Sequence, residues 1–513
     1  MKQKNSTRLQ IGALTATAAL GATALVGSPA QAAGVTDTSA LRDAVTADNI
    51  SVHLDALQAI ADANGDNRQA GTPGHDASVD YVEGLLQAAG YQTTRQQFSY
   101  ERTDFSDSAL RKVSPTPATD YVFGVDYFPM DFAGEGDTGE VPVTVVDVNL
   151  AGDRASTSGC EATDFTGFPD GNIALIQRGS CNFSVKADNA IAAGASGVII
   201  FNQGNVVPGD DRLGLFGGTL DPPVRSIPVV SAPFDLGEEW ATTPGLVLQL
   251  RVDAEIIPVT TENLLADTPT GRTDRTVVVG GHLDSVGEGP GINDNGSGTA
   301  TILETALQMS ELGIQPRNRV RFAFWSGEED GLLGSSYYVS QLSARGIKDT
   351  ALNLNFDMIG SVNAVNFVYD GDGDALGVSG PNGSGTIEDV FTDFFASEGE
   401  ASEPTDFDGR SDYFGFINAG IPAGGLFTGA EGIKTAEQAA IFGGTAGTAY
   451  DPCYHAACDT TANVNDDTLD LMADAVAHAT LTFAQTTSAV NGTANGKAMG
   501  KIDWANKGDR ALR

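Results

Sequence analysis

Imidazole and carboxylate side chains follow three strand-like segments in the second half of the chain. In chain order these are His282, Asp284 and Asp294 after the β-branched run at 276–280, Glu328 and Glu329 after 320–325, and Asp357 after 351–356. A later segment, 451–458, adds His455 between two cysteines. A single acidic residue in such a loop is more often a helix cap or a solvated turn than a ligand. Because open α/β sheets bind ligands at the carboxyl ends of their strands, the recurrence predicts one shared site.

Histidine and carboxylate groups together are suitable ligands for zinc. Two histidines and three carboxylates suffice for a pair of ions if one carboxylate bridges them. Two metals about 3.5–4 Å apart stabilise both of the charges that develop during hydrolysis. The sequence has no HExxH motif, which excludes a zincin arrangement. The residue types therefore predict a two-metal hydrolytic site.

Strand and helix patterns alternate after about residue 260. Strands are expected at 276–280, 320–325, 351–357 and 421–426, and helices at 299–311, 331–342, 385–398 and 467–486. This alternation predicts an α/β fold with a doubly wound, mostly parallel sheet. Two helices, within 41–63 and from Thr72 to Gly90, and a strand at 92–100 come earlier, with His53 and His75 expected at the surface or as caps. Residues 260–263 are expected to form a linker.

Residues 141–252 show a pattern of their own. Strands are expected at 143–148, 173–177, 198–201 and 246–252, with a helix at 184–193. Such a β-rich unit between the early helices and the later α/β region indicates an inserted domain.

The composition limits the class of protein. Apolar residues make up 41% and charged residues 19%, as in a globular chain. The 29 basic and 67 acidic residues give a net charge of −38, which argues against a nucleic-acid partner because that requires a basic surface. An acidic surface also solubilises secreted proteins, so the charge does not identify a substrate.

The first 33 residues have the pattern of a secretory signal peptide. Basic Lys2, Lys4 and Arg8 precede an apolar stretch from Ile11 to Val26, and a small-residue cleavage site follows at 30–32. The stretch is shorter than the roughly 20 apolar residues of a membrane span. We therefore expect a cleaved, extracellular protein without a membrane partner.

Four cysteines fall into two separated pairs. Export favours disulfide bonds, and four cysteines allow three connectivities. Because neighbours in the chain pair most economically, we expect Cys160–Cys181 and Cys453–Cys458. The alternative, a thiolate metal site, is less favoured because neither pair has CxxC spacing.

Several long motifs resemble one peptidase family. These are GGHLDSV, GINDNGSG, FWSGEEDGLLGS, NFDMIG, DGRSDY, AGGLFTGAE and DPCYHAACDT between residues 280 and 460, and GTPGHDASVDYVEGLLQAAGY at 71–91. They are similar to, and ordered as in, the M28 di-zinc aminopeptidases, notably the secreted Streptomyces-type leucine aminopeptidases and the vacuolar-type aminopeptidases. The segments RGSCNFSVKADNA and AGASGVIIFN resemble a protease-associated domain, an insert that covers or extends a substrate cleft.

The resemblance implies a role for each residue of the proposed site. His282 and Asp357 would hold one zinc ion, Glu329 and His455 the other, and Asp294 would bridge them. Glu328 would be the general base, taking a proton from the zinc-bridging water and delivering it to the leaving amine. Tyr454 would stabilise the developing oxyanion, and Asp284 would orient the imidazole of His282. The alternative for Tyr454 is a tyrosine that packs on the disulfide, and the alternative for Asp284 is a plain turn residue.

Further residues are candidates for binding substrate or calcium. Arg410 resembles the substrate-binding arginine of the family, with a structural salt bridge as the alternative. Met358 and Phe427 are expected to line the side-chain pocket, with ordinary core packing as the alternative. Asp470 and Asp474, one helical turn apart, together with Asp43 resemble a calcium site of the Streptomyces-type enzymes. A solvated helix face is the alternative for that group.

The expected protein is a secreted monomeric aminopeptidase with two Zn²⁺ per chain and a possible Ca²⁺. It would remove large apolar residues from peptides with a free N-terminus, because an apolar pocket gains from desolvating an apolar side chain. A carboxypeptidase, a glutaminyl cyclase and a non-catalytic receptor-like protein are the alternatives. The expected parts are a signal peptide at 1–33, a peptidase domain split between 34–125 and 260–490, the insert at 126–259 and a mobile tail at 491–513.

Overall fold

We describe the protein from a computed structural model, which defines residues 36–105, 107–207, 210–220 and 223–492. The expected signal peptide and residues 493–513 of the expected tail lie outside these residues. Asn491 ends a short helix, α13 (Ser488–Asn491), and Val490 of that helix packs into the main core.

An eight-stranded sheet forms the centre of the peptidase part. Its strand order is β1 (Gln92–Asp104), β13 (Glu255–Asp267), β15 (Asn318–Trp325), β14 (Arg272–His282), β16 (Thr350–Phe356), β19 (Ala423–Phe427), β17 (Phe367–Tyr369) and β18 (Glu403–Thr405). Strands β15, β14, β16 and β19 run parallel. Strand β1 pairs antiparallel with β13, β13 with β15, and β17 with β19, while β18 runs parallel to β17. The parallel centre confirms the predicted fold class, and antiparallel strands extend it at both edges.

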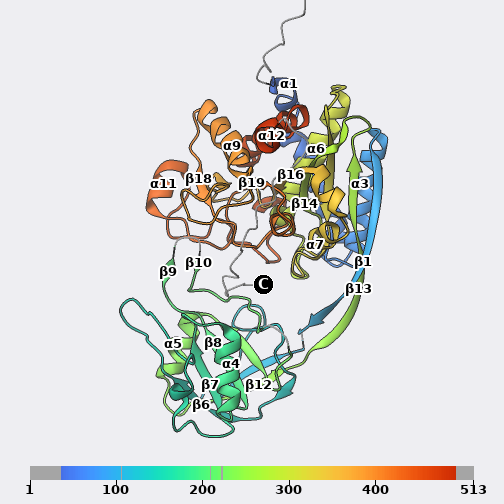
Figure 1. Cartoon of the computed structure of the whole chain (residues 1–513). Coiled ribbons are helices and arrows are strands. Elements are labelled where there is room, and N and C mark those ends of the chain that lie inside the picture. Colours follow the sequence, from blue (N-terminus) through green and yellow to red (C-terminus); the bar gives the residue numbers. More distant parts are fainter. Residues whose placement is uncertain (1–35, 106, 208–209, 221–222, 493–513) are drawn as a thin grey trace, which may run out of the picture. The chain divides into compact units, whose positions relative to one another are not determined.

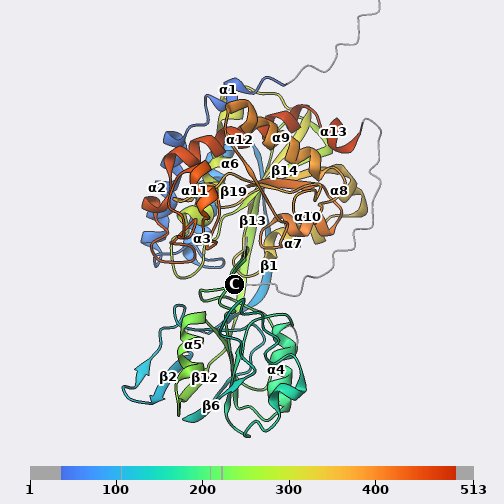
Figure 2. The ribbon, with the colours of Figure 1, turned by 90° about the vertical axis from the view of Figure 1, so that its left-hand side faces the viewer.

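Both faces of this sheet are buried, which explains its runs of β-branched and aromatic residues. In β14, Val277 and Val279 pack on one face and Val278 on the other. The first face is covered by α1 (Ser39–Arg42), α2 (Ala47–Ala63), α3 (Pro73–Ala88), α6 (Gly298–Glu311), α9 (Ser384–Glu398) and α12 (Asp466–Gln485), and the second by α7 (Leu333–Ser340), α8 (Ala344–Asp349) and α10 (Tyr413–Asn418). Figures 1 and 2 show the two helical layers around β14 and β19.

Helix caps explain where the major helices begin. Thr46 accepts a hydrogen bond from Asn49 at the start of α2 (3.3 Å), and Asn465 accepts one from Thr468 at the start of α12 (3.0 Å). Thr72 precedes Pro73, whose fixed φ suits the first turn of α3. Helices α6, α7, α9 and α12 begin within two residues of the predicted starts, although only α12 of these has a side-chain cap. Helices α8, α10, α11 (Ala436–Phe442) and α13 were not predicted.

Two expectations about the early and connecting segments are wrong. Residues 260–263 are not a linker: they lie inside β13, which pairs with β1 from Gln92↔Asp267 to Asp104↔Glu255. His53 and His75 do not lie at the surface, since they are 6% and 0% exposed. His53 joins three helices, because its ring contacts Tyr81 of α3 (2.8 Å) and Glu304 of α6 (3.1 Å).

The second sheet lies in the insert and has nine strands. Its order is β3 (Thr119–Asp120), β2 (Ala109–Ser114), β12 (Val247–Val252), β6 (Val141–Val146), β7 (Ile173–Gln177), β8 (Gly197–Phe201), β11 (Val229–Ala232) and β4 (Phe128–Pro129), with β5 (Gly136–Asp137) beside β12. Leu175 and Ile199 pack on one face and Ile176 and Ile200 on the other. The predicted strands correspond to β6, β7, β8 and β12, and the predicted helix is α4 (Phe183–Ala192). Strand β11 and helix α5 (Phe234–Thr242) were not predicted.

Both expected disulfide bonds are present, Cys160–Cys181 in the insert and Cys453–Cys458 in the peptidase part. Within the defined ranges, the helices are all too short or too polar to span a lipid bilayer.

Candidate active site

The sheet order places three ligand-bearing strand ends side by side. Strand β14 lies between β15 and β16, and all three run parallel. His282 is the last residue of β14, Asp357 follows the last residue of β16, and Glu328 and Glu329 lie in the turn after β15. The shared strand direction thus brings these residues to one edge, as predicted from their positions.

Asp294 comes from a tight irregular turn, Ile292–Ser297, that leads into α6. The backbone leaves helical geometry at Asp294 (φ −104°, ψ 91°), which turns its side chain toward the strand ends. Asn295 anchors the turn by donating to the Phe356 carbonyl (2.9 Å) and accepting from the Met358 amide (3.2 Å). Gly298 permits this approach, since a Cβ there would lie 2.3 Å from the Phe356 oxygen.

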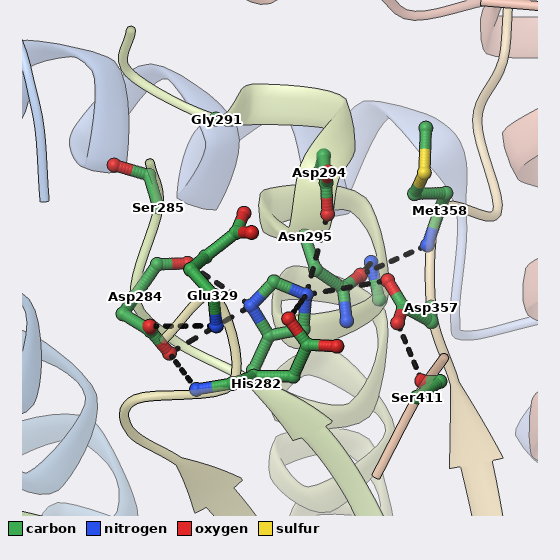
Figure 3. Close-up of polar contacts among 12 residues, drawn as sticks. His282, Asp284, Ser285, Gly291, Asp294, Asn295, Glu329, Asp357, Met358 and Ser411 are labelled. Atoms are coloured by element: carbon green, nitrogen blue, oxygen red, sulfur yellow. Dashed lines mark hydrogen bonds and ion pairs between the residues drawn. The ribbon is translucent and has the colours of Figure 1, made fainter. Parts of the chain in front are cut away.

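The two oxygens of Asp294 face different histidines. Oδ1 lies 3.3 Å from Nε2 of His282, which is also 3.3 Å from Oδ1 of Asp357. Oδ2 lies 3.2 Å from Nε2 of His455, which is also 3.3 Å from Oε2 of Glu329. Figure 3 shows His282 between Asp294 and Asp357. The five residues thus form two histidine–carboxylate groups that share Asp294, as the predicted ligand sets require.

These distances fit zinc ligands. Donor atoms bound to zinc at about 2.0–2.2 Å in tetrahedral geometry lie about 3.3–3.6 Å from one another. His282 Nε2, His455 Nε2 and Asp357 Oδ1 are buried atoms that make no hydrogen bond among the described residues. Burial alone would lower the pKa of His282, but Glu328 and Asp357 raise it well above its ordinary value. The group therefore favours positive charge, of the kind that a divalent cation would supply.

Glu328 lies beside the first of these groups without belonging to either. It is 1% exposed, and its Oε2 lies 3.7 Å from His282 Nε2. Asp284 lies behind it, and its carboxylate faces the amides of Glu328 and Glu329, each at 3.4 Å. The carboxylate thus holds the turn that carries the candidate base and one ligand.

The expected role of Asp284 toward His282 needs one correction. Nδ1 of His282 lies closer to the backbone carbonyl of Asp284 (3.1 Å) than to its carboxylate (3.7 Å). The imidazole is therefore oriented mainly by the peptide group. Burial raises the pKa of the Asp284 carboxyl to about 7, although the charge of His282 opposes this.

Tyr454 and Arg410 lie together at the second histidine. The ring of Tyr454 stacks on His455 with centroids 3.8 Å apart, and its Oη accepts a hydrogen bond from Arg410 Nη2 at 3.1 Å. Arg410 also pairs with Glu431 (2.8 Å). Burial raises the pKa of the Tyr454 hydroxyl, while Arg410 acts in the opposite direction. The hydroxyl thus stays protonated and able to donate. The salt-bridge alternative for Arg410 is present as a pair with Glu431.

The other candidate residues have mixed surroundings. Met358 is 3% exposed with φ 49°, and Phe427 stacks on Phe367 at 6.0 Å, so both contribute to packing near Asp357. In the candidate calcium group, Asp470 accepts from the Ala47 amide (2.9 Å) and Asp474 pairs with Arg42 (3.5 Å). Among the described residues, these aspartates and Asp43 do not form a ligand cluster. Calcium binding therefore gains no support and stays a prediction.

Several residues that support the site were not predicted. Ser411 donates to Oδ2 of Asp357 (2.5 Å). Asp459 accepts from the backbone of the Asp294 turn, and buried Arg68 donates to the carbonyls of Leu283, Pro290 (2.9 Å) and Gly291 (2.6 Å). Ser411 and Asp459 belong to motifs noted in the sequence, DGRSDY and DPCYHAACDT. Arg68 lies in no such motif, and its polar turn gives no signal of burial.

A parallel α/β sheet that presents two histidine–carboxylate groups joined by one aspartate defines a metal-dependent hydrolase. Comparison with known proteins agrees with this class. The model of peptidase family M28 matches residues 263–480, and the model of the PA domain matches residues 141–240.

Full-length relatives are aminopeptidases. An aminopeptidase of Pseudomonas aeruginosa is 49% identical over 447 residues, which cover 87% of this chain and 82% of that protein. A leucine aminopeptidase 2 of Trichophyton tonsurans is 38% identical, covering 87% and 86%. A zinc aminopeptidase from Bacillus subtilis has a TM-score of 0.61 at 25% identity, covering 85% and 94%. The chain thus belongs to peptidase family M28, and it is an aminopeptidase with an inserted PA domain.

Proposed function

We propose that this M28 aminopeptidase is a secreted two-zinc enzyme that releases large apolar residues from the free N-terminus of peptides. The observation that carries the proposal is the geometry of Asp294, whose two oxygens each lie within 3.3 Å of a different histidine. Such a carboxylate is suited to bridge two ions. The zinc aminopeptidase of Bacillus subtilis, which shares the fold, supports the choice of metal.

The proposed ligands divide into two groups around this bridge. His282 and Asp357 would hold one zinc ion, and Glu329 and His455 the other. Bound zinc would lower the pKa of a water molecule and polarise the scissile carbonyl. The chain supplies the ligand geometry in advance, because strands, caps and the Asn295 anchor fix each side chain before any ion binds.

Glu328 is the proposed general base. Its carboxylate is buried next to His282 yet lies 3.7 Å from Nε2, so it is near the reacting water without sharing the ligand contacts. It takes a proton from the attacking water and later gives that proton to the leaving amine. Asp284 holds the turn that carries it. This arrangement lets one residue perform both proton transfers.

Tyr454 and Arg410 are proposed to act on the substrate. The Tyr454 hydroxyl accepts from Arg410 and burial keeps it protonated, so that it would donate to the oxyanion that forms on the carbonyl. Arg410 is held by Glu431 and presents the rest of its guanidinium to bound peptide. Met358 and Phe427 would contact the apolar side chain of the first residue.

The remaining parts of the proposal concern the whole chain. Residues 1–33 would act as the signal peptide, and the two disulfides fit an extracellular protein. The insert would govern access of peptides to the site in the peptidase part. Its sheet includes β2 and β3, which come before the expected boundary at residue 126. A monomer is the expected assembly.

Zinc analysis combined with a substrate panel tests this function. We expect two zinc ions per chain after mild purification, and cleavage of Leu-p-nitroanilide but not of acetyl-Leu-p-nitroanilide. Cleavage confined to N-acetylated peptides with a free C-terminus would indicate a carboxypeptidase, and cyclisation of N-terminal glutamine a cyclase. A folded protein that binds no zinc would reject the mechanism.

A further inference from the structure

A buried carboxylate holds the backbone of the turn that carries Asp294. Asp459 is 1% exposed and lies just after the Cys453–Cys458 disulfide. Its Oδ1 accepts from the Asn293 amide at 2.9 Å, and its Oδ2 accepts from the Asp294 amide at 3.0 Å. Its backbone carbonyl accepts from the Ile292 amide at 3.1 Å. Three successive amides of the turn therefore bind to one residue.

The geometry requires a group that accepts at both oxygens. A third donor, Nδ2 of Asn463, lies 2.9 Å from Oδ1 of Asp459. An asparagine at position 459 would present its NH2 group to one of these N–H groups, and the buried donor would lose its partner. Asparagine has nearly the same shape as aspartate, so this change tests the acceptor and not the packing.

The contact joins two segments that supply ligands to the same metal position. Asp459 is four residues after His455, and its amide donates to the Ala456 carbonyl at 3.0 Å. The hydrogen bonds from the Asp294 turn thus tie the backbone of one ligand to the loop of another. His455 Nε2 and Asp294 Oδ2, the ligand atoms of these two segments, lie 3.2 Å apart.

The other metal position has different anchors. His282 belongs to β14, and Asp357 is held by Ser411. Neither contact involves the loop at 451–463. Loss of the Asp459 hydrogen bonds should therefore lower the zinc affinity of one position more than that of the other. The more affected position is formed by Asp294, Glu329 and His455, and the less affected one by His282, Asp357 and Asp294.

We propose that Asp459 is a positioning residue that sets the affinity of the His455 metal position by holding the backbone of Asp294. The proposal rests on the proposed two-zinc function. It assigns to Asp459 a selective effect on one of two ions, which a residue that merely stabilises the fold would not have.

The test is calorimetric titration of zinc into metal-free protein, comparing the wild type with Asp459→Asn. We expect two sites in the wild type. In the variant we expect a loss of affinity of at least ~10-fold at one site, since changes behind metal ligands typically cost about 10- to 100-fold, and a smaller loss at the other site, which shares only Asp294 with the affected backbone. Activity of the variant should return when zinc is added above the weakened dissociation constant.

Asp370→Asn is the matched control. Asp370 is also buried (0% exposed) and also accepts from two backbone amides, those of Gly373 (2.8 Å) and Leu376 (2.7 Å). Its loop supplies none of the proposed zinc ligands. Its carboxylate lies close to those of Asp372 and Asp374, so any binding there is counted apart from the two proposed zinc positions. The melting temperatures of both variants in chelator measure how much stability is lost when a buried carboxylate acceptor is replaced. The zinc affinity of Asp370→Asn should remain that of the wild type.

The outcomes separate this inference from the proposed function. Equal weakening of both sites, or no weakening, in Asp459→Asn with a normal wild type overturns the role of Asp459 alone. A wild type with fewer than two sites overturns the proposed function and this inference with it. If Asp459→Asn does not fold, Asn463→Ala removes one donor to Asp459 and should weaken the same single site to a smaller degree; an equal effect on both sites overturns the proposal.

Discussion

Asp294 shows how one residue determines the character of a site. Each of its oxygens faces a histidine that also contacts a second carboxylate, Asp357 or Glu329. Carboxylates collected in a buried space repel one another, so the arrangement is favourable only with compensating positive charge. In the metal-free protein, the neighbouring carboxylates raise the pKa of His282 and so favour its positively charged form. Metal binding and local stability are therefore coupled at this residue.

Glu328 allows the chemical role to be separated from metal binding. Glu328→Gln keeps the shape of the side chain but removes its basicity, so we expect retained zinc and a turnover at least ~10²-fold lower. Metal analysis and steady-state kinetics on the same sample measure both. Glu311→Gln, at the exposed end of α6, is the control and should change neither. Near-normal turnover in Glu328→Gln would show that another group takes the proton.

His75 makes stability depend on pH through a group that is not a proposed ligand. Burial lowers its pKa from 6.5 to about 4. Between these values the unfolded chain binds a proton that the folded protein does not, so stability is complete above pH 6.5 and falls as the pH decreases. A shift of this size corresponds to about 3 kcal/mol.

The variant His75→Leu should lose less stability than the wild type between pH 7.5 and pH 4. Urea unfolding of metal-free protein at both pH values gives the change in the free energy of unfolding for the wild type and for the variant. The contributions of all other titrating groups cancel when the two changes are compared. The difference at pH 7.5 measures the packing cost of the substitution. Identical losses in the two proteins would mean that His75 does not titrate as its burial indicates.

At the scale of elements, the close approach of α6 to the end of β16 depends on Gly298. A Cβ at this position would lie 2.3 Å from the Phe356 carbonyl and 2.4 Å from Asn295 Oδ1. We expect Gly298→Ala to lower the free energy of unfolding by about 2 kcal/mol, because the backbone must move to avoid overpacking. Zinc affinity should fall as well, since the Asp294 turn moves with the helix.

A glycine on the exposed face of a helix provides the control for this substitution. Gly84 lies inside α3, and no atom comes within 4 Å of an added Cβ. Gly84→Ala should therefore raise stability by up to about 1 kcal/mol, as expected for alanine in a helix. If the close approach of α6 to β16 explains the loss of stability, the melting temperature should fall in Gly298→Ala and rise in Gly84→Ala. Loss of stability in both would contradict this.

The sequence predicts those elements whose signal is local. The run Val277–Val279 and the strands that follow it repeat at helix-length intervals, and parallel strands place His282, Glu329 and Asp357 at one edge whatever the exact bounds. The motif around His455 adds the remaining group. The starts of α2, α3 and α12 also follow from Thr and Asn caps within three residues. These parts of the fold and site could be predicted because each depends on neighbours in the chain.

Long-range contacts explain what the sequence did not predict. The polar run at 260–263 suggests a linker, but Thr261 and Asn263 are buried in the sheet. Thr261 hydrogen-bonds Ser326 (2.6 Å), and Asn263 donates to the Gly334 carbonyl (2.8 Å). Asp459 binds an amide 165 residues away, and Arg68 binds carbonyls more than 200 residues away. Nothing in the local pattern marks such a partner, so these residues become visible only in the folded chain.

At the scale of the whole molecule, the charge of −38 favours the proposed substrate. A free N-terminus is cationic, whereas an acetylated one is neutral, so an acidic enzyme attracts the former as it approaches. Salt screens this attraction over about 8 Å at physiological ionic strength. The net charge therefore affects the rate of encounter, and the contacts of the site decide which peptide is cleaved.

The pairing of β1 with β13 has a consequence for the ancestry of the chain. The segment that contains the insert leaves the peptidase part after Asp104 and returns at Glu255, and these two residues are register partners in neighbouring strands. Antiparallel partners lie about 5 Å apart, a gap that a two-residue hairpin turn closes. The insert also has hydrophobic cores of its own. An ancestral peptidase with a plain hairpin at this place could thus have acquired the whole segment in one event, without rearrangement of a single strand of its sheet.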